Sequence, residues 1–428
     1  MLPPVRATVR TVALLVLCGP VLAGCIFGFG LLPYSTPSKS PVSSLLAVSP
    51  SPGPTAQPMP LVRGESLPGA PVAAVWNIAG DRSIQISAWQ SGKPLRNILN
   101  VPRLQPDRGS REDVRVSAAP TGRFFAVTEV VTSGTATVDD FRVISATGAL
   151  LFSRRLGIQE ATIRWSPDGS RLVINAGLAW LVITLKEGRP PAVQEIVTSR
   201  PRQPDGRVLS PWMLIGFSED GRWIYGADQT GGTPWFRPAV RVAAAGGPIQ
   251  SIKRLPTTKG ARLPFPPTFG NPRIEPVIDS PSGSVVTWVC TVSDTCRVNV
   301  WRDRTAVVFD LPTGATNLDL AWNGGSLIGL WTQKLSREGT IRVSRFDAAS
   351  RPGVERRITT LPASPGGGSL VGLTPGFVLV GLGSGVPGAR MELVLVRLSD
   401  GARSVAQSAV GSPGVELFSF AGWLPATR

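Results

Sequence analysis

A short turn motif recurs along this chain, and its recurrence limits the possible folds more than any other feature. In RWSPDGSRLVI, Pro167 presets a φ of about −65°, and the Asp168 side chain can hydrogen-bond to its own backbone. Gly169 permits the positive φ that closes a tight turn. Because apolar segments lie on both sides of the turn, this stretch predicts a β-hairpin.

The same signal returns at intervals of about 40–60 residues, which is typical of β-propeller blades rather than of helical solenoids. Each unit contains four short apolar segments, such as ATIRW, RLVIN, AWLVITL and VQEIV. No sustained 3.6-residue apolar period is present from residue 71 to residue 428. The sequence therefore predicts an all-β protein that folds as a β-propeller. The turn glycines are Gly122, Gly169, Gly221, Gly283, Gly325 and Gly376.

The two ends of the propeller region predict how its ring closes. The segment VELFSFAGWLP (415–425) supplies one strand with none after it, whereas residues 71–100 supply three strands without an innermost partner. Pairing the two segments removes the free strand edge that an open ring would leave. We therefore expect seven four-stranded blades over residues 71–428, with the C-terminal strand closing the first blade. Six or eight blades are also compatible with the spacing.

The turn motif resembles that of TolB-like and WD-repeat-like β-propellers, whose blades carry W/F-S-P-D-G before an aliphatic strand. WSPDGSRLV follows this pattern almost fully, and FSEDGRWIY follows it well. The resemblance implies a propeller fold, and it implies that the motif residues shape turns rather than perform chemistry. These structural turn residues are Trp165, Pro167, Asp168, Gly169, Asp220 and Gly221.

The first 32 residues predict export and attachment to a membrane. Arg6 and Arg10 precede an apolar run that contains Leu-Ala-Gly-Cys, which resembles the lipobox of bacterial lipoproteins. In this interpretation residues 1–24 are a signal peptide and Cys25 carries the lipid. In the alternative, residues 11–32 stay as an uncleaved membrane anchor, because the apolar run is long enough to span a bilayer. Both interpretations give an extracytoplasmic protein anchored to the bacterial cell membrane.

The following segment, up to residue 70, predicts a disordered tether. Pro and Ser dominate it, and its pattern could not bury a core. Extended at about 3.1 Å per residue, it would reach roughly 100 Å. Residues 25–70 thus form a lipidated cysteine with a linker, and residues 71–428 form the propeller.

Two cysteines predict a disulfide in the propeller. Cys290 and Cys296 flank a five-residue loop between two strands of one blade, a geometry that suits a disulfide clamping a hairpin. An oxidising location would favour the bond, which would contribute about 2 kcal/mol for so small a loop. The alternative is a metal site, which two thiols and no histidine would make poorly.

Charge and composition narrow the possible functions. The chain has 44 Lys and Arg against 28 Asp and Glu, a net charge of +16, and no histidine. The positive balance favours anionic partners, although the scattered arginines also agree with a chain rich in Arg, Ala, Gly and Pro. We expect no nucleic-acid binding, because no basic run or nucleic-acid-binding motif occurs. The missing imidazole excludes Ser-His and Cys-His nucleophiles and His-ligated metals, so we expect no cofactor and no metal.

Paired carboxylates are the remaining route to catalysis. They would suit a carbohydrate-active enzyme of the envelope, but adjacent carboxylates on a strand point to opposite faces. We therefore favour a non-catalytic binding or scaffold module of the cell envelope. A regulatory lipoprotein that docks on a membrane sensor kinase is the other alternative. The candidate carboxylates are Asp139, Asp140, Glu219, Asp220, Asp279 and Asp319.

Three long segments predict a candidate binding face opposite the repeat turns. Residues 200–211, 228–238 and 257–272 combine aromatic residues with arginines on loops of a rigid scaffold, a composition typical of binding hot spots. The partner would be an envelope protein, or an anionic component such as lipid head groups or a cell-wall polymer. In the alternative, the aromatic side chains pack beneath their own loops. The residues are Arg202, Arg207, Trp235, Phe236, Arg237, Arg262, Phe265 and Phe269.

The disulfide prediction can be tested by thiol labelling of the unreduced, denatured protein. We expect Cys290 and Cys296 to stay unlabelled until a reductant is added, because a disulfide has no free thiol. Mass spectrometry of the labelled peptides reads out both positions. Labelling of both cysteines without reductant would contradict the prediction.

Overall fold

The described residues of this computed structural model are all in strands, turns or irregular segments, and none is in a helix. They are 66–79, 82–105, 114–133, 136–156, 161–198, 212–218, 220–227, 239–252, 274–275, 285–290, 296–302, 305–323, 326–333, 339–347, 353–362, 367–383, 391–407 and 417–425. Within these ranges no helix is long and apolar enough to cross a membrane.

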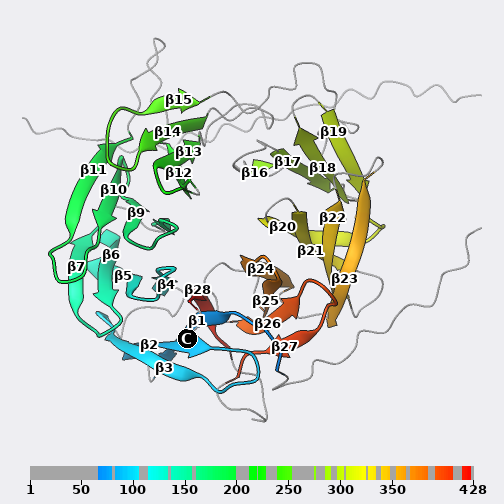
Figure 1. Cartoon of the computed structure of the whole chain (residues 1–428), viewed down its shortest axis with the longest axis horizontal. Coiled ribbons are helices and arrows are strands. Elements are labelled where there is room, and N and C mark those ends of the chain that lie inside the picture. Colours follow the sequence, from blue (N-terminus) through cyan, green and yellow to red (C-terminus); the bar gives the residue numbers. More distant parts are fainter. Residues whose placement is uncertain are drawn as a thin grey trace, which may run out of the picture. The chain divides into compact units, whose positions relative to one another are not determined.

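The described strands form seven four-stranded antiparallel sheets (Figure 1). In sheet order, the first contains β28 (Ser419–Leu424), β1 (Val72–Ala79), β2 (Ser83–Trp89) and β3 (Arg96–Pro102). The second contains β4 (Val114–Ala118), β5 (Phe124–Ser133), β6 (Ala136–Ser145) and β7 (Leu150–Arg155). The third contains β8 (Ile163–Trp165), β9 (Arg171–Asn175), β10 (Ala179–Thr184) and β11 (Ala192–Val197).

The remaining four sheets follow in chain order. The fourth contains β12 (Met213–Phe217), β13 (Trp223–Ala227), β14 (Ala239–Ala243) and β15 (Gln250–Ile252). The fifth contains β16 (Ile274–Glu275), β17 (Val285–Cys290), β18 (Cys296–Arg302) and β19 (Thr305–Asp310). The sixth contains β20 (Ala315–Asn323), β21 (Ser326–Gln333), β22 (Thr340–Asp347) and β23 (Val354–Pro362). The seventh contains β24 (Gly368–Thr374), β25 (Phe377–Gly383), β26 (Met391–Arg397) and β27 (Arg403–Val405).

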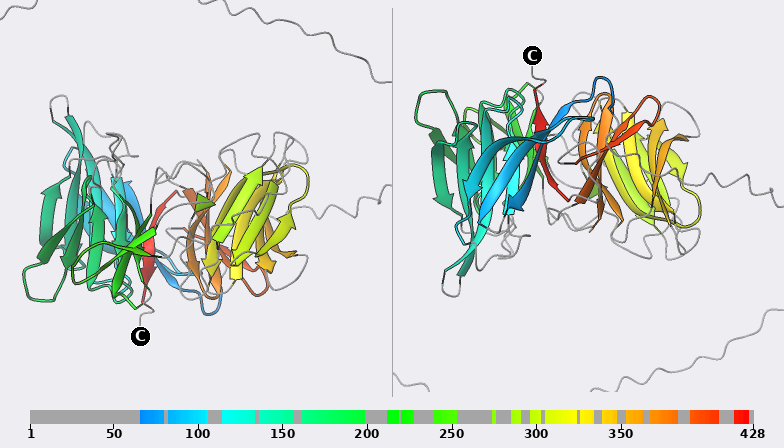
Figure 2. Two further views of the ribbon diagram at one scale, coloured as in Figure 1. Left: turned by 90° about the horizontal axis from the view of Figure 1, so that it is seen from above. Right: turned by 90° about the horizontal axis from the view of Figure 1, so that it is seen from below.

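The first sheet is built from both ends of the propeller. Strand β28 pairs antiparallel with β1, with Val72 opposite Leu424 and Trp76 opposite Ser419. Figure 2 shows β28 in red beside the blue strands of this sheet. The predicted pairing of the C-terminal segment with the first three strands is therefore present, and it satisfies the edge that β1 would otherwise expose.

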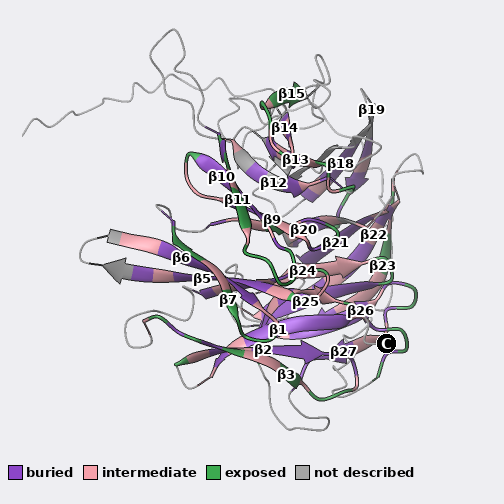
Figure 3. Cartoon of the chain, turned by 60° about the vertical axis from the view of Figure 1, so that its left-hand side comes forward, coloured by how far each residue is buried: buried purple, intermediate pink, exposed green. Residues whose placement is uncertain are grey.

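Burial changes across each sheet, as Figure 3 shows. Strands β10 and β25, in the interior of their sheets, are buried on both faces, whereas the fourth strands β7 and β11 are mostly exposed. The central strands read as continuous apolar runs because a neighbouring sheet covers each face. This arrangement confirms the all-β propeller that the sequence predicts.

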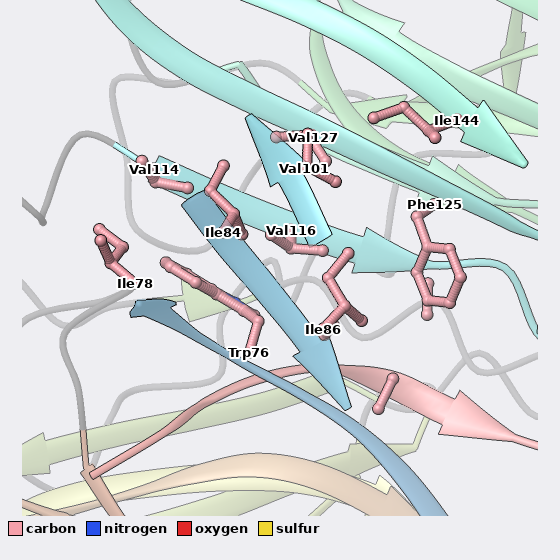
Figure 4. Packing of buried hydrophobic residues seen from close by; sticks show 13 residues of the cluster. Trp76, Ile78, Ile84, Ile86, Val101, Val114, Val116, Phe125, Val127 and Ile144 are labelled. Carbon is pink, nitrogen blue, oxygen red and sulfur yellow. The ribbon is translucent and has the colours of Figure 1, made fainter. Parts of the chain in front are cut away.

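Apolar clusters fill the space between successive sheets. In the cluster between the first and second sheets, Trp76, Ile84 and Ile86 lie against Val116 and Phe125 (Figure 4). Similar clusters join the second sheet to the third, the third to the fourth, the fifth to the sixth and the sixth to the seventh. A further cluster joins the seventh sheet to the first, so the first sheet packs on both of its faces.

The repeat turn is held by a serine that the sequence analysis did not consider. Ser166 Oγ donates to Asp168 Oδ1 at 2.6 Å and accepts from the backbone N–H of Arg171 at 2.9 Å. The backbone N–H of Ser170 also donates to Asp168 Oδ1, at 3.1 Å. Gly169 has a φ of 65°, as the turn requires. The predicted turn is confirmed, and the serine orients its aspartate.

The turn in the fourth sheet repeats this geometry. Ser218 Oγ donates to Asp220 Oδ1 at 2.6 Å and accepts from the backbone N–H of Trp223 at 2.9 Å. Gly221 has a φ of 68°. The hydrogen bond from Ser218 lowers the pKa of Asp220, as the one from Ser166 lowers the pKa of Asp168. The motif shared by both turns is therefore Ser-x-Asp-Gly.

Turns of neighbouring sheets lie against one another on one face of the propeller. A side chain at Gly169 would meet Thr121 of the preceding turn at 3.0 Å, and one at Gly221 would meet Pro167 at 3.6 Å. Gly122 is similarly close to the end of β28. We call this side the turn face. In an antiparallel sheet the connections β2–β3, β6–β7 and β10–β11 end on the same side as these turns.

The chain joins the propeller on the turn face. Leu67 is only 4% exposed and packs between the first and seventh sheets, and its backbone N–H donates to Ser91 Oγ at 2.8 Å. Gln90 Nε2 donates to the carbonyl of Ala70. The sequence analysis places residues 66–70 in the linker, but the structure packs them against the β2–β3 connection because Leu67 and Ala70 gain burial there.

The two cysteines of the predicted disulfide are direct cross-strand partners. Cys290 on β17 lies opposite Cys296 on β18. Directly opposed residues have Cα atoms about 4.5–5.5 Å apart, within the range of about 4.4–6.8 Å that disulfides need. Cys296 is fully buried, with its sulfur 2.9 Å from the carbonyl oxygen of Ala315. The backbone register suits the bond, which stays a prediction.

The Ser-x-Asp-Gly turn predicts a pH-dependent contribution to stability. We expect Asp168→Ala to lower the free energy of unfolding by about 1 kcal/mol at pH 7, because several net-favourable hydrogen bonds are lost. The folded-state pKa of Asp168 is lowered, so its contribution is present above the unfolded pKa of about 3.9 and disappears as the pH falls through the lower folded value. Denaturant unfolding at several pH values measures the difference.

Glu187→Ala is the control for this prediction. Glu187 is exposed and pairs only with the exposed side chain of Arg123, so its replacement should change stability by less than about 0.5 kcal/mol. Equal effects of the two substitutions at every pH would show that the turn hydrogen bonds do not stabilise the fold.

Candidate functional site

Several residues that the sequence singles out lie outside the described part of the chain. Cys25 is one of them, and the carboxylates Glu219 and Asp279 are two more. All eight residues of the candidate binding face also lie there: Arg202, Arg207, Trp235, Phe236, Arg237, Arg262, Phe265 and Phe269. These assignments remain predictions.

The described candidate carboxylates hold parts of the fold together. Asp139 Oδ2 accepts from the backbone N–H of Ala161 at 2.8 Å, so it fixes the start of the third sheet. Asp319 Oδ2 accepts from the backbone N–H of Leu370 at 2.8 Å and links the sixth and seventh sheets. Burial raises the pKa of Asp319. Each carboxylate thus has a structural hydrogen bond rather than an open site.

A buried charge cluster, which the sequence analysis missed, surrounds Glu129. The carboxylate has no exposed surface, and it accepts from Arg103 Nε at 3.2 Å and Arg142 Nη2 at 2.9 Å. Backbone N–H groups of Leu104 and Gln105 donate to it as well, and Arg142 Nη1 reaches the carbonyl of Pro102 at 2.9 Å. The cluster therefore fastens the segment after β3 to the second sheet. Its sequence signal is one acid inside the apolar run FFAVTEVV.

Asp140 lies opposite Glu129 in the strand register, so two carboxylates approach each other here. Burial raises the pKa of Asp140, although Arg142 and Arg155 oppose the shift. The two catalytic carboxylates of a glycosidase must face a space that holds a sugar and a water molecule. Glu129 is fully enclosed and faces no such space. The arrangement stabilises the fold and offers no reactive carboxylate pair.

An open groove lies on the turn face between the second and third sheets. It has a volume of about 630 Å³ and is bounded by the β6–β7 and β10–β11 connections. We call it the basic groove. Its principal side chains are Arg123, Phe124, Leu150, Lys186, Arg189 and Pro191.

The basic groove combines a cationic rim with an apolar wall. Lys186 and Arg189 are both exposed on the β10–β11 connection, and Arg123 Nη1 lies 3.2 Å from Glu187 Oε2 across the groove. Leu150 is 60% exposed and adds apolar surface to the groove. Apolar concave surfaces with a few polar groups are typical ligand sites, and these charges favour an anionic or amphipathic ligand.

A second groove on the same face has a similar character. It measures about 510 Å³ and lies at the β2–β3 connection, next to the residues through which the chain joins the propeller. Lys93 and Arg96 are exposed along it, beside Pro94 and Leu95. The sequence predicts binding on the opposite face and gives no signal for either groove; the basic groove forms only where connections of two separate sheets meet.

The described residues contain no group of three or more metal-ligating side chains. This finding concerns only the ranges given above. Within them, the acidic side chains discussed here bind serine hydroxyls, backbone amides or arginines instead.

Comparison with known proteins gives structural similarity only. No family model matches the chain, and no curated protein matches it. TolB from Acinetobacter baumannii is 14% identical, with a TM-score of 0.34 over 69% of this chain and 64% of that protein. The chain thus spans less than two thirds of its length. Hsv2 from Kluyveromyces lactis is 10% identical, with a TM-score of 0.41 over 78% of this chain and 97% of that one.

A third similar structure is the apo form of prolyl oligopeptidase B from Galerina marginata. It is 12% identical and has a TM-score of 0.42 over 82% of this chain and 51% of that protein. At these levels of identity and superposition, none of the three assigns a function to this chain.

The Glu129 cluster predicts two opposite mutational effects. We expect Glu129→Gln to lower the free energy of unfolding by about 3 kcal/mol, because two buried guanidinium groups lose their counter-charge. Asp140→Asn should change the free energy of unfolding little at pH 4. Towards pH 7 the variant should become more stable relative to the unchanged protein. The reason is that the raised folded pKa of Asp140 makes its ionised form costly as the pH rises above the unfolded value.

Denaturant unfolding of both variants at pH 4 and pH 7 makes this measurement. Similar losses for the two variants would contradict the assignment of Glu129 as the centre of the cluster. A constant difference between Asp140→Asn and the unchanged protein would contradict the role of burial at Asp140.

Proposed function

We propose that the protein is a membrane-tethered, extracytoplasmic β-propeller that acts as a non-catalytic binding or scaffold module of the cell envelope. The observation that carries the proposal is the basic groove, an open site with a cationic rim and an apolar wall on a rigid scaffold. Such a site suits an anionic component of the envelope, such as a lipid head group or a cell-wall polymer. The net charge of +16 supports the same class of partner.

The tether is the N-terminal segment, either as a lipid on Cys25 after removal of residues 1–24 or as an anchor over residues 11–32. Its apolar run and the lipobox-like sequence support this assignment. The proposed Cys290–Cys296 disulfide agrees with it, since disulfides persist outside the cytoplasm.

In the proposal, the face opposite the turns binds a second partner. Its long loops, with Trp235 and the neighbouring Arg237 among their residues, would contact an envelope protein. A propeller with one site on each face could bring two components together, which is the action of a scaffold. Asp139, Asp319 and Glu129 support a non-catalytic role, because each serves a structural hydrogen bond or ion pair.

Binding of a fluorescent glycerol-phosphate oligomer tests the proposed ligand class. We expect saturable binding to the full chain that weakens with salt, and we expect Lys186→Glu combined with Arg189→Glu to weaken it at least about tenfold, since charge reversal repels an anion. Fluorescence anisotropy gives the dissociation constants. A neutral dextran of equal length should not bind.

Arg82→Glu is the matched control, because Arg82 is an exposed arginine on the β1–β2 connection, away from the turn face. It should leave the affinity unchanged. Equal weakening by Arg82→Glu and by the double variant would overturn the assignment of the groove. Failure of the unchanged protein to bind the oligomer would overturn the proposed ligand class.

A further inference from the structure

The described chain begins at residue 66 on the turn face. The last residues before β1 are held on the turn face by Leu67, by Ser91 and by Gln90. Ser66 lies so close to Gly92 that a side chain at Gly92 would meet it at 2.5 Å. The described chain therefore begins on the turn face, beside the groove that contains Lys93.

Positive charge is concentrated on the same part of that face. In the described turn-face segments of the first three sheets, the acidic residues are Asp168 and Glu187. Glu187 pairs with Arg123, and Asp168 is bound by Ser166 and Ser170 within its turn. The basic residues of the same segments are Lys93, Arg96, Arg123, Arg171, Lys186 and Arg189.

In the described turn-face segments of the fourth and seventh sheets, arginines have acidic partners. In the fourth sheet, Arg222 lies 3.7 Å from Asp220. In the seventh, Arg397 binds Asp400 at 2.6 Å, which lowers the pKa of Asp400 to about 2. Among these described segments, the unbalanced positive charge thus lies over the first three sheets, where the described chain also begins.

We propose that the turn face of the first three sheets docks on the anionic lipid head groups of the membrane that holds the N-terminal segment. This inference rests on the proposed tether. Two observations select lipid as the partner: the described chain begins on this face at residue 66, and the charge of the face is complementary to an anionic bilayer. Leu150 and Leu95 add apolar surface at the level of the basic side chains, as interfacial binding requires.

Docking in this orientation has a consequence for the other face. The connection between β11 and β12 (199–211) and the connection between β13 and β14 (228–238) follow the opposite ends of the strands. They would point away from the bilayer, where a second envelope component could reach them. The tether then keeps the basic surface at high local concentration near the lipid, so weak individual contacts are sufficient for docking.

The test uses the full chain reconstituted into two kinds of vesicle. One is pure phosphatidylcholine, and the other contains about 30 mol% phosphatidylglycerol, to supply the anionic surface. Hydrogen–deuterium exchange is followed in peptides that cover residues 90–96 and 184–191. We expect slower exchange in both peptides only on the anionic vesicles, and we expect the difference to vanish at about 0.5 M NaCl, where surface charges are screened.

Two variants separate specific docking from general attraction. Lys186→Glu with Arg189→Glu should reduce the docked population roughly tenfold and restore fast exchange in both peptides. Arg82→Glu should leave the protection intact. A second pair, Lys186→Gln with Arg189→Gln, should give an intermediate effect, and unchanged thermal unfolding of all variants confirms that the fold is kept.

Each outcome bears on one proposal. Identical exchange on the two vesicle types, with the protein floating with both, would overturn membrane docking. If the glycerol-phosphate oligomer then still bound the groove, the proposed function would stand with a soluble anionic partner. Failure of the protein to float with either vesicle type would instead overturn the proposed tether.

Discussion

Apolar packing between neighbouring sheets is the interaction on which the rest of this structure depends. A four-stranded sheet with two apolar faces is stable only when both faces are covered. Here Trp76, Phe125, Leu172 and their neighbours provide that cover between sheets. Closure of the first sheet by β28 matters for the same reason, because β28 contributes to the packing on both sides of that sheet.

Polar interactions refine this arrangement at defined positions. The Ser-x-Asp-Gly turns set the direction in which each second strand begins, and their glycines let adjacent turns touch. On the other side, Glu129 and Asp139 hold the segments that lead from one sheet to the next. Buried charges are costly unless they are paired, so the Arg103–Glu129–Arg142 cluster specifies one position for its segment.

The two faces of the propeller therefore differ in character. The turn face is compact, and over the first three sheets it has basic grooves beside the residues that lead to the N-terminal segment. The strand ends that lead from one sheet to the next lie on the other side. A scaffold that distinguishes its two faces in this way can keep one surface for its anchor and another for a partner, which is the basis of the proposed function.

The sequence by itself determined the fold class, the repeat turns and the pairing of the chain's C-terminal strand with its first strands. These depend on local signals: turn chemistry around Gly169 and Gly221, and apolar runs of strand length. Tertiary structure alone decided the grooves and the Glu129 cluster. Arg123 and Lys186 are 63 positions apart and meet only because two sheets pack together. Glu129 becomes a buried ion-pair centre only when the segment after β3 brings Arg103 to it, and no local sequence pattern predicts that contact.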